Sequence, residues 1–166
     1  MKFITLNGNS VELANVGSKG NWDKLINKDL KPNMAYVLDN GHTYITNASG
    51  KVNYVEADLS KITMDRNTYQ QSVVGKSGEA SDQGGHLIAS ALGGAGDRIN
   101  LVPMDSVLNN GEWKQMENTL KKALENGQNV SMKIDLKYPS SSDVRPSQFN
   151  IITNIDGVIK PYQFKQ

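Results

Sequence analysis

One stretch of the chain, residues 82–117, collects the side chains that could carry out a hydrolytic reaction. They are an isolated histidine, two asparagines and a glutamate: His86, Asn100, Asn109 and Glu117. A histidine can accept a proton from water, and amide or carboxylate oxygens can hold a hard cation. This set predicts a one-metal site for the hydrolysis of phosphodiester bonds.

His86 is the candidate general base. Hydrolysis of a phosphodiester requires a base for the attacking water, a cation that neutralises the developing charge, and stabilisation of the leaving oxygen. The ordinary imidazole pKa of about 6.5 leaves much of the ring neutral at physiological pH. Gly84-Gly85, directly before the histidine, permits close approach of a polymer backbone. The alternative is a structural histidine satisfied by a backbone partner, which is the commoner role of an isolated histidine.

Asn109 and Glu117 are the candidate residues of a metal site. Mg²⁺ prefers oxygen ligands, keeps several waters and often needs only one or two protein contacts. Glu117 lies eight positions after Asn109 (117 − 109 = 8) and close to the apolar side that carries Trp113 and Leu120. A glutamate there needs a partner such as a hydrated metal or a basic side chain. The alternatives are a helix cap, because Asn109-x-x-Glu112 resembles a capping box, and a glutamate that reaches water.

Three arginines and a second histidine complete the candidates. His42 follows an expected hairpin turn, where we expect an exposed side chain without a catalytic role. Arg66, Arg98 and Arg145 could each contact phosphate, although an arginine in a loop is more often a solvated charge. Because Arg66 and Arg98 lie nearest to the histidine in the sequence, they are the candidates for binding the substrate.

Composition limits the kinds of site that the chain can form. It has 166 residues, enough for one domain with a real core, and it contains no cysteine and only two histidines. Disulfides and thiolate metal sites are therefore excluded, and a site with several histidines is disfavoured. The net charge of +1 argues against a strongly basic surface for nucleic acid, so any basic groove must be local. No apolar stretch suits a membrane span or a signal peptide.

Two strands and a helix must position the site residues. Residues 86–89 and 99–102 are short strand-like runs separated by a Gly-rich connection, and Pro103 is expected to end the second strand. Residues 111–126 have apolar side chains at helical spacing, and Gly127 is the natural end of the helix. The predicted order is therefore strand, Gly-rich connection, strand, helix.

The flanking segments predict antiparallel strands. Residues 60–81 are too polar to form a buried element and predict a surface loop that leads into the site. Spacing and turn residues predict the other elements: a short helix within 20–32, strands at 36–38, 43–45, 52–55 and 130–136, and a hairpin of 149–155 with 158–164. We expect an α+β fold with additional antiparallel strands packed around one main helix. Within a single compact domain, residues 1–60 should form a β-meander extension and residues 61–166 the core.

Several motifs within residues 64–126 resemble the DNA/RNA non-specific endonucleases, which have the ββα-metal, or His-Me finger, fold. They are DQGGHLIA, NLVPM and LNNGEWKQME. The family pattern is Asp-Arg-Gly-His, then Asn with an aliphatic residue and Pro, then Leu-Asn-x-Gly-x-Trp and a Glu on the same helix. The matching residues are Asp82, His86, Asn100, Pro103, Leu108, Asn109, Gly111, Trp113 and Glu117, and the step between the asparagines (109 − 100 = 9) also agrees.

The resemblance implies a role for each candidate residue. It makes His86 the general base, Asn109 the one direct protein ligand of a hydrated Mg²⁺ (or Mn²⁺), and Glu117 the holder of metal-bound water. It makes Asn100 a support of the site, and the expected product carries a 5′-phosphate. This sequence departs from the family pattern in two ways, since Gln83 replaces the family arginine and an additional glycine precedes the histidine. Arg66 is the candidate substitute for that arginine.

The motif GGHLIA together with the upstream segment KPNMAYVLDNGHTY is similar to C-terminal nuclease toxin domains of bacterial polymorphic, contact-dependent effectors. This resemblance implies delivery as part of a larger effector, action in the cytoplasm of a target cell, and a cognate immunity protein. We expect DNA rather than RNA as the substrate. The alternatives are an RNase or a nuclease without a toxin role and, from another class, a catalytically silent binding or immunity-type module in which His86 is structural and Asn109 caps the helix.

Overall fold

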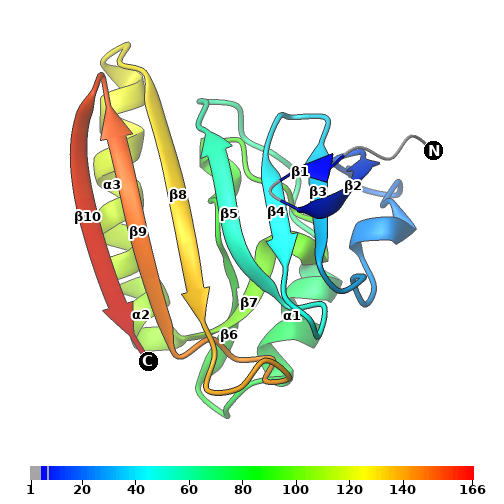
Figure 1. The fold of residues 1–166 in the computed structure, drawn as a ribbon. Helices are drawn as coiled ribbons and strands as arrows, with labels where there is room; N and C mark the ends of the chain where they lie inside the picture. Colours follow the sequence, from blue (N-terminus) through cyan, green and yellow to red (C-terminus); the bar gives the residue numbers. More distant parts are fainter. Residues whose placement is uncertain (1–4, 7) are drawn as a thin grey trace.

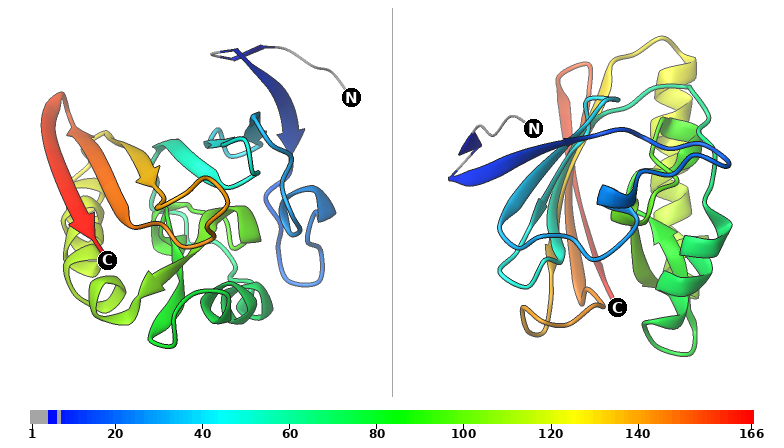
Figure 2. Two further views of the ribbon diagram at one scale, coloured as in Figure 1. Left: turned by 60° about the horizontal axis from the view of Figure 1, so that its bottom comes forward. Right: turned by 90° about the vertical axis from the view of Figure 1, so that its right-hand side faces the viewer.

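A large, twisted sheet forms one layer of the molecule, and the helices with a short β-ribbon form the other (Figures 1 and 2). The computed structural model describes residues 5–6 and 8–166. The right-hand view of Figure 2 shows the sheet on one side and α1, α3 and the ribbon together on the opposite side. The site elements of the chain therefore share one layer and rest on one face of the sheet.

The described residues place eight strands in the large sheet. In spatial order these are β1 (Thr5–Leu6), β2 (Asn9–Ala14), β3 (Met34–Leu38), β4 (Thr43–Thr46), β5 (Val52–Asp58), β8 (Val130–Lys137), β9 (Gln148–Ile155) and β10 (Val158–Lys165). Neighbouring strands are antiparallel except for β2 and β3, which are parallel. Strands from residues 1–60 and from the C-terminal third thus form one continuous sheet.

The second layer contains the ribbon and the helices. The ribbon pairs β6 (Asp82–His86) with β7 (Leu101–Asp105), and the helices are α1 (Thr68–Lys76), α2 (Ser106–Asn110) and α3 (Glu112–Glu125). Short 3₁₀ turns lie at Lys24–Ile26, Ser90–Leu92 and Arg98–Asn100. The α+β class and the ββα order predicted from the sequence are confirmed, with α3 as the main helix.

The core between the layers fixes the position of α3. The buried stripe of α3 packs against the alternating inward side chains of β8, as expected for an amphipathic helix on a half-buried sheet. Trp113 is fully buried, and its ring lies edge-on to Phe149 with centroids 5.0 Å apart and tilted against Phe164 at 5.7 Å. Because rings in such pairs are closely fitted, the first turns of α3 have a defined height above β9 and β10.

The predicted helix at 111–126 is confirmed as α3, which ends before Gly127 with φ 78°. A separate short helix, α2, precedes it and the two are broken at Gly111. A Cβ at Gly111 would lie 2.5 Å from the carbonyl oxygen of Val107. Only glycine therefore permits this corner, which turns the chain from the ribbon onto the helix.

The prediction of a surface loop over residues 60–81 is wrong, because residues 68–76 form α1. This helix starts at Asn67, whose side chain accepts a hydrogen bond of 3.0 Å from the backbone N–H of Gln70. It packs on β6 by backbone rather than by large apolar side chains: a Cβ on Gly75 would lie 2.8 Å from the backbone nitrogen of Gly84. A helix that packs through glycine has little hydrophobic periodicity, so its sequence resembles a loop.

The ribbon strands are shifted from their predicted positions. His86 ends β6 rather than beginning a strand, and Pro103 lies within β7 opposite Gly84 rather than ending it. The carbonyl of Pro103 accepts a bond of 3.0 Å from the Gln166 side chain, and Asp105 N–H donates to Gln166 at 2.8 Å. These positions face away from β6, so the missing N–H of proline costs the ribbon no hydrogen bond.

Other local predictions had mixed outcomes. The strands at 36–38, 43–45, 52–55, 130–136, 149–155 and 158–164 are all present, whereas the helix expected within 20–32 is only the turn Lys24–Ile26. His42, expected to be exposed, is buried, and its ring nitrogens bond to the carbonyl of Asp58 (3.0 Å) and the side chain of Asn40 (3.2 Å). No helix in the described part of the chain is long and apolar enough to cross a membrane.

Candidate active site

His86 lies at the end of β6 with only 8% of its surface exposed. Its ring makes no hydrogen bond to any described residue, and Nε2 is buried without a partner. Burial, and to a smaller extent the positive charge of Arg66, lower the pKa of His86 to about 4. At neutral pH the ring is therefore uncharged. The alternative of a histidine satisfied by a backbone partner is not observed, and the ring has a nitrogen free to accept a proton.

Asn100 holds the segment that follows His86. Its Oδ1 accepts bonds from the hydroxyl of Tyr44 (2.7 Å) and the N–H of Ile88 (3.0 Å). Its Nδ2 donates to the carbonyls of Ile88 (2.7 Å) and Ala95 (2.8 Å). Because Asn100 is fully buried and every one of these bonds is to protein, its side chain positions the connection after His86 rather than meeting a reactant.

Asn109 lies at the end of α2, one turn after the ribbon. Asp105 Oδ2 caps α2 by accepting bonds from the N–H groups of Val107 (3.1 Å) and Leu108 (3.2 Å). Asn109 Nδ2 donates to Gln83 Oε1 at 2.8 Å, while its Oδ1 has no hydrogen bond to the described residues. The N-cap of α3 is Gly111 with no side-chain cap. The alternative that Asn109 caps the helix is therefore wrong, and its amide oxygen is available to a ligand.

Glu117 lies one turn after Trp113 on α3 and is partly buried. Burial raises its pKa to about 7, with Lys114, the Trp113 indole and Arg66 acting in the opposite direction. No ion pair of Glu117 is formed within the described residues. A partly buried carboxylate without a paired cation is an arrangement that a divalent ion with its waters would stabilise.

Arg66 joins the group from the segment before α1. Its Nε donates to Ser90 Oγ at 3.2 Å, and its charge acts on the pKa of both His86 and Glu117. Arg66 therefore lies near both residues. The guanidinium of Arg98 instead pairs with Asp29 at 3.4 Å. Arg98 lines a cleft between the ribbon and the sheet whose described lining includes none of the other candidates.

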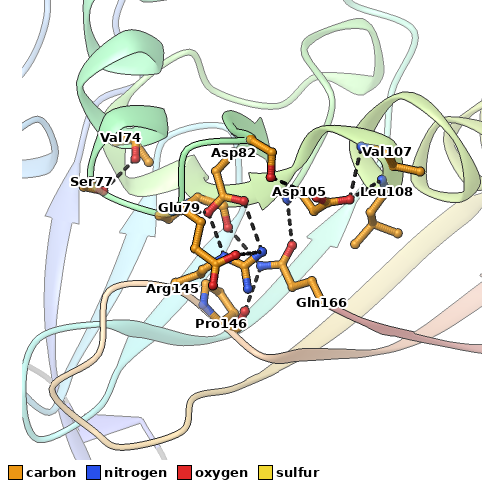
Figure 3. Close-up of polar contacts among 12 residues, drawn as sticks. Val74, Ser77, Glu79, Asp82, Asp105, Val107, Leu108, Arg145, Pro146 and Gln166 are labelled. Carbon is orange, nitrogen blue, oxygen red and sulfur yellow. Dashed lines mark hydrogen bonds and ion pairs between the residues drawn. The ribbon is translucent and has the colours of Figure 1, made fainter.

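A clamp at the start of β6, which the sequence did not indicate, supports the site (Figure 3). The Asp82 side chain is fully buried and receives two bonds from Arg145, Nε to Oδ2 at 2.7 Å and Nη2 to Oδ1 at 3.1 Å. Burial alone would raise the pKa of Asp82, but the bonds from Arg145 and from the N–H of Glu79 hold it below its ordinary value. Arg145 is thus not free to contact phosphate. It lies 63 positions from Asp82, so no local pattern indicated the pair.

The same clamp includes the last residue of the chain. Gln166 donates from Nε2 to the carbonyls of Pro103 (3.0 Å) and Pro146 (2.7 Å), and Figure 3 places its side chain beside Arg145. The β8–β9 loop and the end of β10 are therefore bonded to both strands of the ribbon. This arrangement makes the ribbon a rigid support for His86 and for the start of α2.

Comparison with known proteins gives one family. Residues 32–157 match the model of the DNA/RNA non-specific endonucleases. The chain is 36% identical over 138 residues to the type VII secretion system protein EssD of Staphylococcus aureus strains USA300 and NCTC 8325, covering 78% of this chain and 22% of that protein. It therefore spans about a fifth of the length of these relatives.

Two solved structures have the same fold. They are NucA from Streptococcus agalactiae with magnesium bound (TM-score 0.62) and with no metal bound (TM-score 0.58), each covering 99% of this chain and 82% of NucA at 16% identity. At this identity the likeness concerns the fold.

Proposed function

The chain belongs to the DNA/RNA non-specific endonuclease family and is a metal-dependent endonuclease, and from this premise we propose that it is a Mg²⁺-dependent DNase that acts as a toxin. Nucleic acid is its substrate, and β6, β7 and α3 form its ββα-metal core. The observation that carries the proposal is the buried, uncharged ring of His86 with an unpartnered Nε2.

We propose that Nε2 of His86 accepts the proton of the attacking water. A ring with a pKa of about 4 is neutral throughout the physiological range, so it is always in the acceptor form. Its low basicity changes when substrate arrives, because a nearby phosphate anion favours the protonated ring and opposes the effect of Arg66. Asn100 keeps the ring in place through the backbone of the next residues.

The donors present fit a hard divalent ion. Asn109 Oδ1 has no protein partner among the described residues, and the Glu117 carboxylate has no ion pair there. We propose that Asn109 ligates the ion directly and that Glu117 holds its water shell. When bound, the ion supplies positive charge that neutralises the phosphate and the leaving oxygen. Oxygen donors favour Mg²⁺ (or Mn²⁺), and the neighbour NucA has a magnesium-bound structure.

Arg66 is the best supported phosphate contact. It is exposed, lies near His86 and Glu117, and has no carboxylate within ion-pair distance in the described structure. Arg98 remains the weaker candidate, since its guanidinium pairs with Asp29. We propose that Arg66 substitutes for the arginine that Gln83 replaces. Because the candidate residues all follow position 60, we also propose that residues 61–166 carry the reaction and that residues 1–60 extend the sheet.

The biological part of the proposal rests on the relative EssD. Its name places it in a type VII secretion system, and it is about five times as long as the aligned segment. We propose that this chain is secreted as part of a larger effector of the contact-dependent kind, cleaves DNA in the target-cell cytoplasm leaving 5′-phosphates, and is neutralised in the producer by an immunity protein.

The test is cleavage of plasmid DNA and of total RNA with Mg²⁺ and with EDTA. We expect the wild type to degrade DNA only with Mg²⁺, and His86→Ala and Asn109→Ala to lose that activity. Asn110→Ala is the matched control, because it removes an exposed amide from the same short helix, next to Asn109. Cleavage confined to RNA would make the enzyme an RNase, and intact nucleic acid with every divalent metal would refute the proposed catalytic site.

A further inference from the structure

We propose that Gln83 is a positioning residue that determines which atom of the Asn109 amide faces the metal ion. The inference rests on the proposed function, in which Asn109 is the direct protein ligand. The observation that supports it is the hydrogen bond of 2.8 Å from Asn109 Nδ2 to Gln83 Oε1. Gln83 stands where the family pattern has arginine, and it gives this position the acceptor for the Asn109 amide.

An asparagine ligand presents a specific problem to a metal site. Its amide ends in an oxygen, which binds a hard cation, and in an NH₂ group, which does not. A half-turn of the amide exchanges the two atoms. When one asparagine is the only direct protein ligand, that half-turn removes the site. An acceptor placed beside the NH₂ group holds the oxygen on the other side, as partners of metal ligands commonly do.

The backbone that carries Gln83 is locked. It pairs with Met104 in the ribbon, and a Cβ on Gly75 of α1 would lie 3.1 Å from its carbonyl carbon and 3.3 Å from its Cα. A Cβ on Gly84 would collide with the backbone oxygen of Gln71. The additional glycine of this sequence therefore lets α1 press directly on β6, and the Gln83 side chain starts from a fixed place next to α2.

Gln83 could in principle also donate, and that pairing would turn Asn109 Oδ1 away from the metal. Two substitutions separate these possibilities. Gln83→Glu can only accept, so it enforces the orientation that binds metal. Gln83→Met has a similar shape and does neither, so the amide of Asn109 becomes free to rotate.

The experiment measures Mn²⁺ binding by calorimetry on the full chain without nucleic acid. We expect Gln83→Met to bind Mn²⁺ about tenfold more weakly than the wild type, and Gln83→Glu to bind at least as tightly. The ¹⁵N spectrum of the metal-free protein supplies a second readout. The Asn109 Nδ2 proton that bonds to Gln83 should lie downfield in the wild type and in Gln83→Glu, and should move upfield in Gln83→Met, which removes the acceptor.

Gln163→Met is the matched control. Gln163 also bonds an asparagine, with Nε2 donating to Asn150 Oδ1 at 3.1 Å, on the exposed surface of the sheet. It should leave Mn²⁺ binding unchanged. Wild-type affinity in Gln83→Met together with lost binding in Asn109→Ala would overturn the role of Gln83 alone. Wild-type affinity in Asn109→Ala would overturn both the metal ligand and its positioning residue.

Discussion

The titration of His86 tests the arrangement of the site most directly. Burial, followed by the charge of Arg66, lowers its pKa to about 4 from an ordinary value of 6.5. The pKa therefore falls by about 2.5 (6.5 − 4 = 2.5), and Arg66, the smaller cause, accounts for less than half of this fall. Replacing Arg66 by methionine, which keeps a long apolar stem and removes the charge, should raise the pKa of His86 by up to about 1 unit.

The assay is a carbon-proton NMR titration of the imidazole groups in EDTA at low salt. The chain has only two histidines, so the spectrum of His86→Ala assigns both signals. Arg98→Met is the control, because Arg98 pairs with Asp29 and does not act on the pKa of His86. A wild-type pKa near 6.5 would contradict the burial of the ring. An unchanged pKa in Arg66→Met would refute the placement of Arg66.

The same shift has a consequence for stability. The folded pKa of His86 lies below its unfolded value, so the stabilisation is complete above pH 6.5 and is lost as pH falls from 6.5 through 4. This difference in pKa between the folded and unfolded protein corresponds to about 3 kcal/mol of unfolding free energy. Urea unfolding of the metal-free protein should therefore show His86→Ala losing less stability than the wild type between pH 6.5 and 4. Equal losses of unfolding free energy in the wild type and in His86→Ala would show that the titration of His86 is not linked to folding.

Three further predictions follow from the structure. The pKa of Glu117 is raised to about 7, so its contribution to the free energy of unfolding is present below pH 4.5 and is lost as pH rises through 7. In urea unfolding of the metal-free protein, Glu117→Gln should therefore lose less stability over this pH range than the wild type. The Mn²⁺ affinity of the wild type should rise over the same range. Asn100→Ala leaves buried backbone groups unpaired and should lower the free energy of unfolding by about 2–4 kcal/mol, whereas the exposed control Asn110→Ala should change it little in the same urea experiment. Arg145→Met leaves the carboxylate of Asp82 buried without its partner and should destabilise by about 3 kcal/mol. Adding Asp82→Asn should recover part of this in a double-mutant cycle, and additive effects would show that the two side chains do not interact.

The sequence by itself determined the elements whose signals are local. Turn residues located the hairpins, including the one at Asp156 and Gly157, which both have positive φ. The apolar stripe of α3 and the glycine after it located the main helix. The order and spacing of the motif residues identified the family, because several ordered blocks agreed in type and in separation.

Tertiary structure decided which of these side chains are bonded to other protein groups and which are available to a ligand. Asn100 and Asn109 are the same residue type, yet the first has all its bonds to protein and the second has a free amide oxygen. Arg66 and Arg98 were both predicted to contact phosphate, but the second is paired with Asp29. These outcomes depend on partners far away in the sequence, which periodicity does not report.

Tertiary structure also decided the elements that pack by backbone contact. Helix α1 rests on β6 through Gly75 and Gly84, so it buries little apolar side chain and its residues have the composition of a loop. Pro103 continues a strand because its carbonyl faces Gln166 rather than β6. The spacing of apolar side chains can be followed in a sequence, whereas contacts made by glycine and by main-chain atoms produce no such pattern and cannot be predicted from it. For this protein those contacts hold the ribbon in place, and the ribbon carries the site.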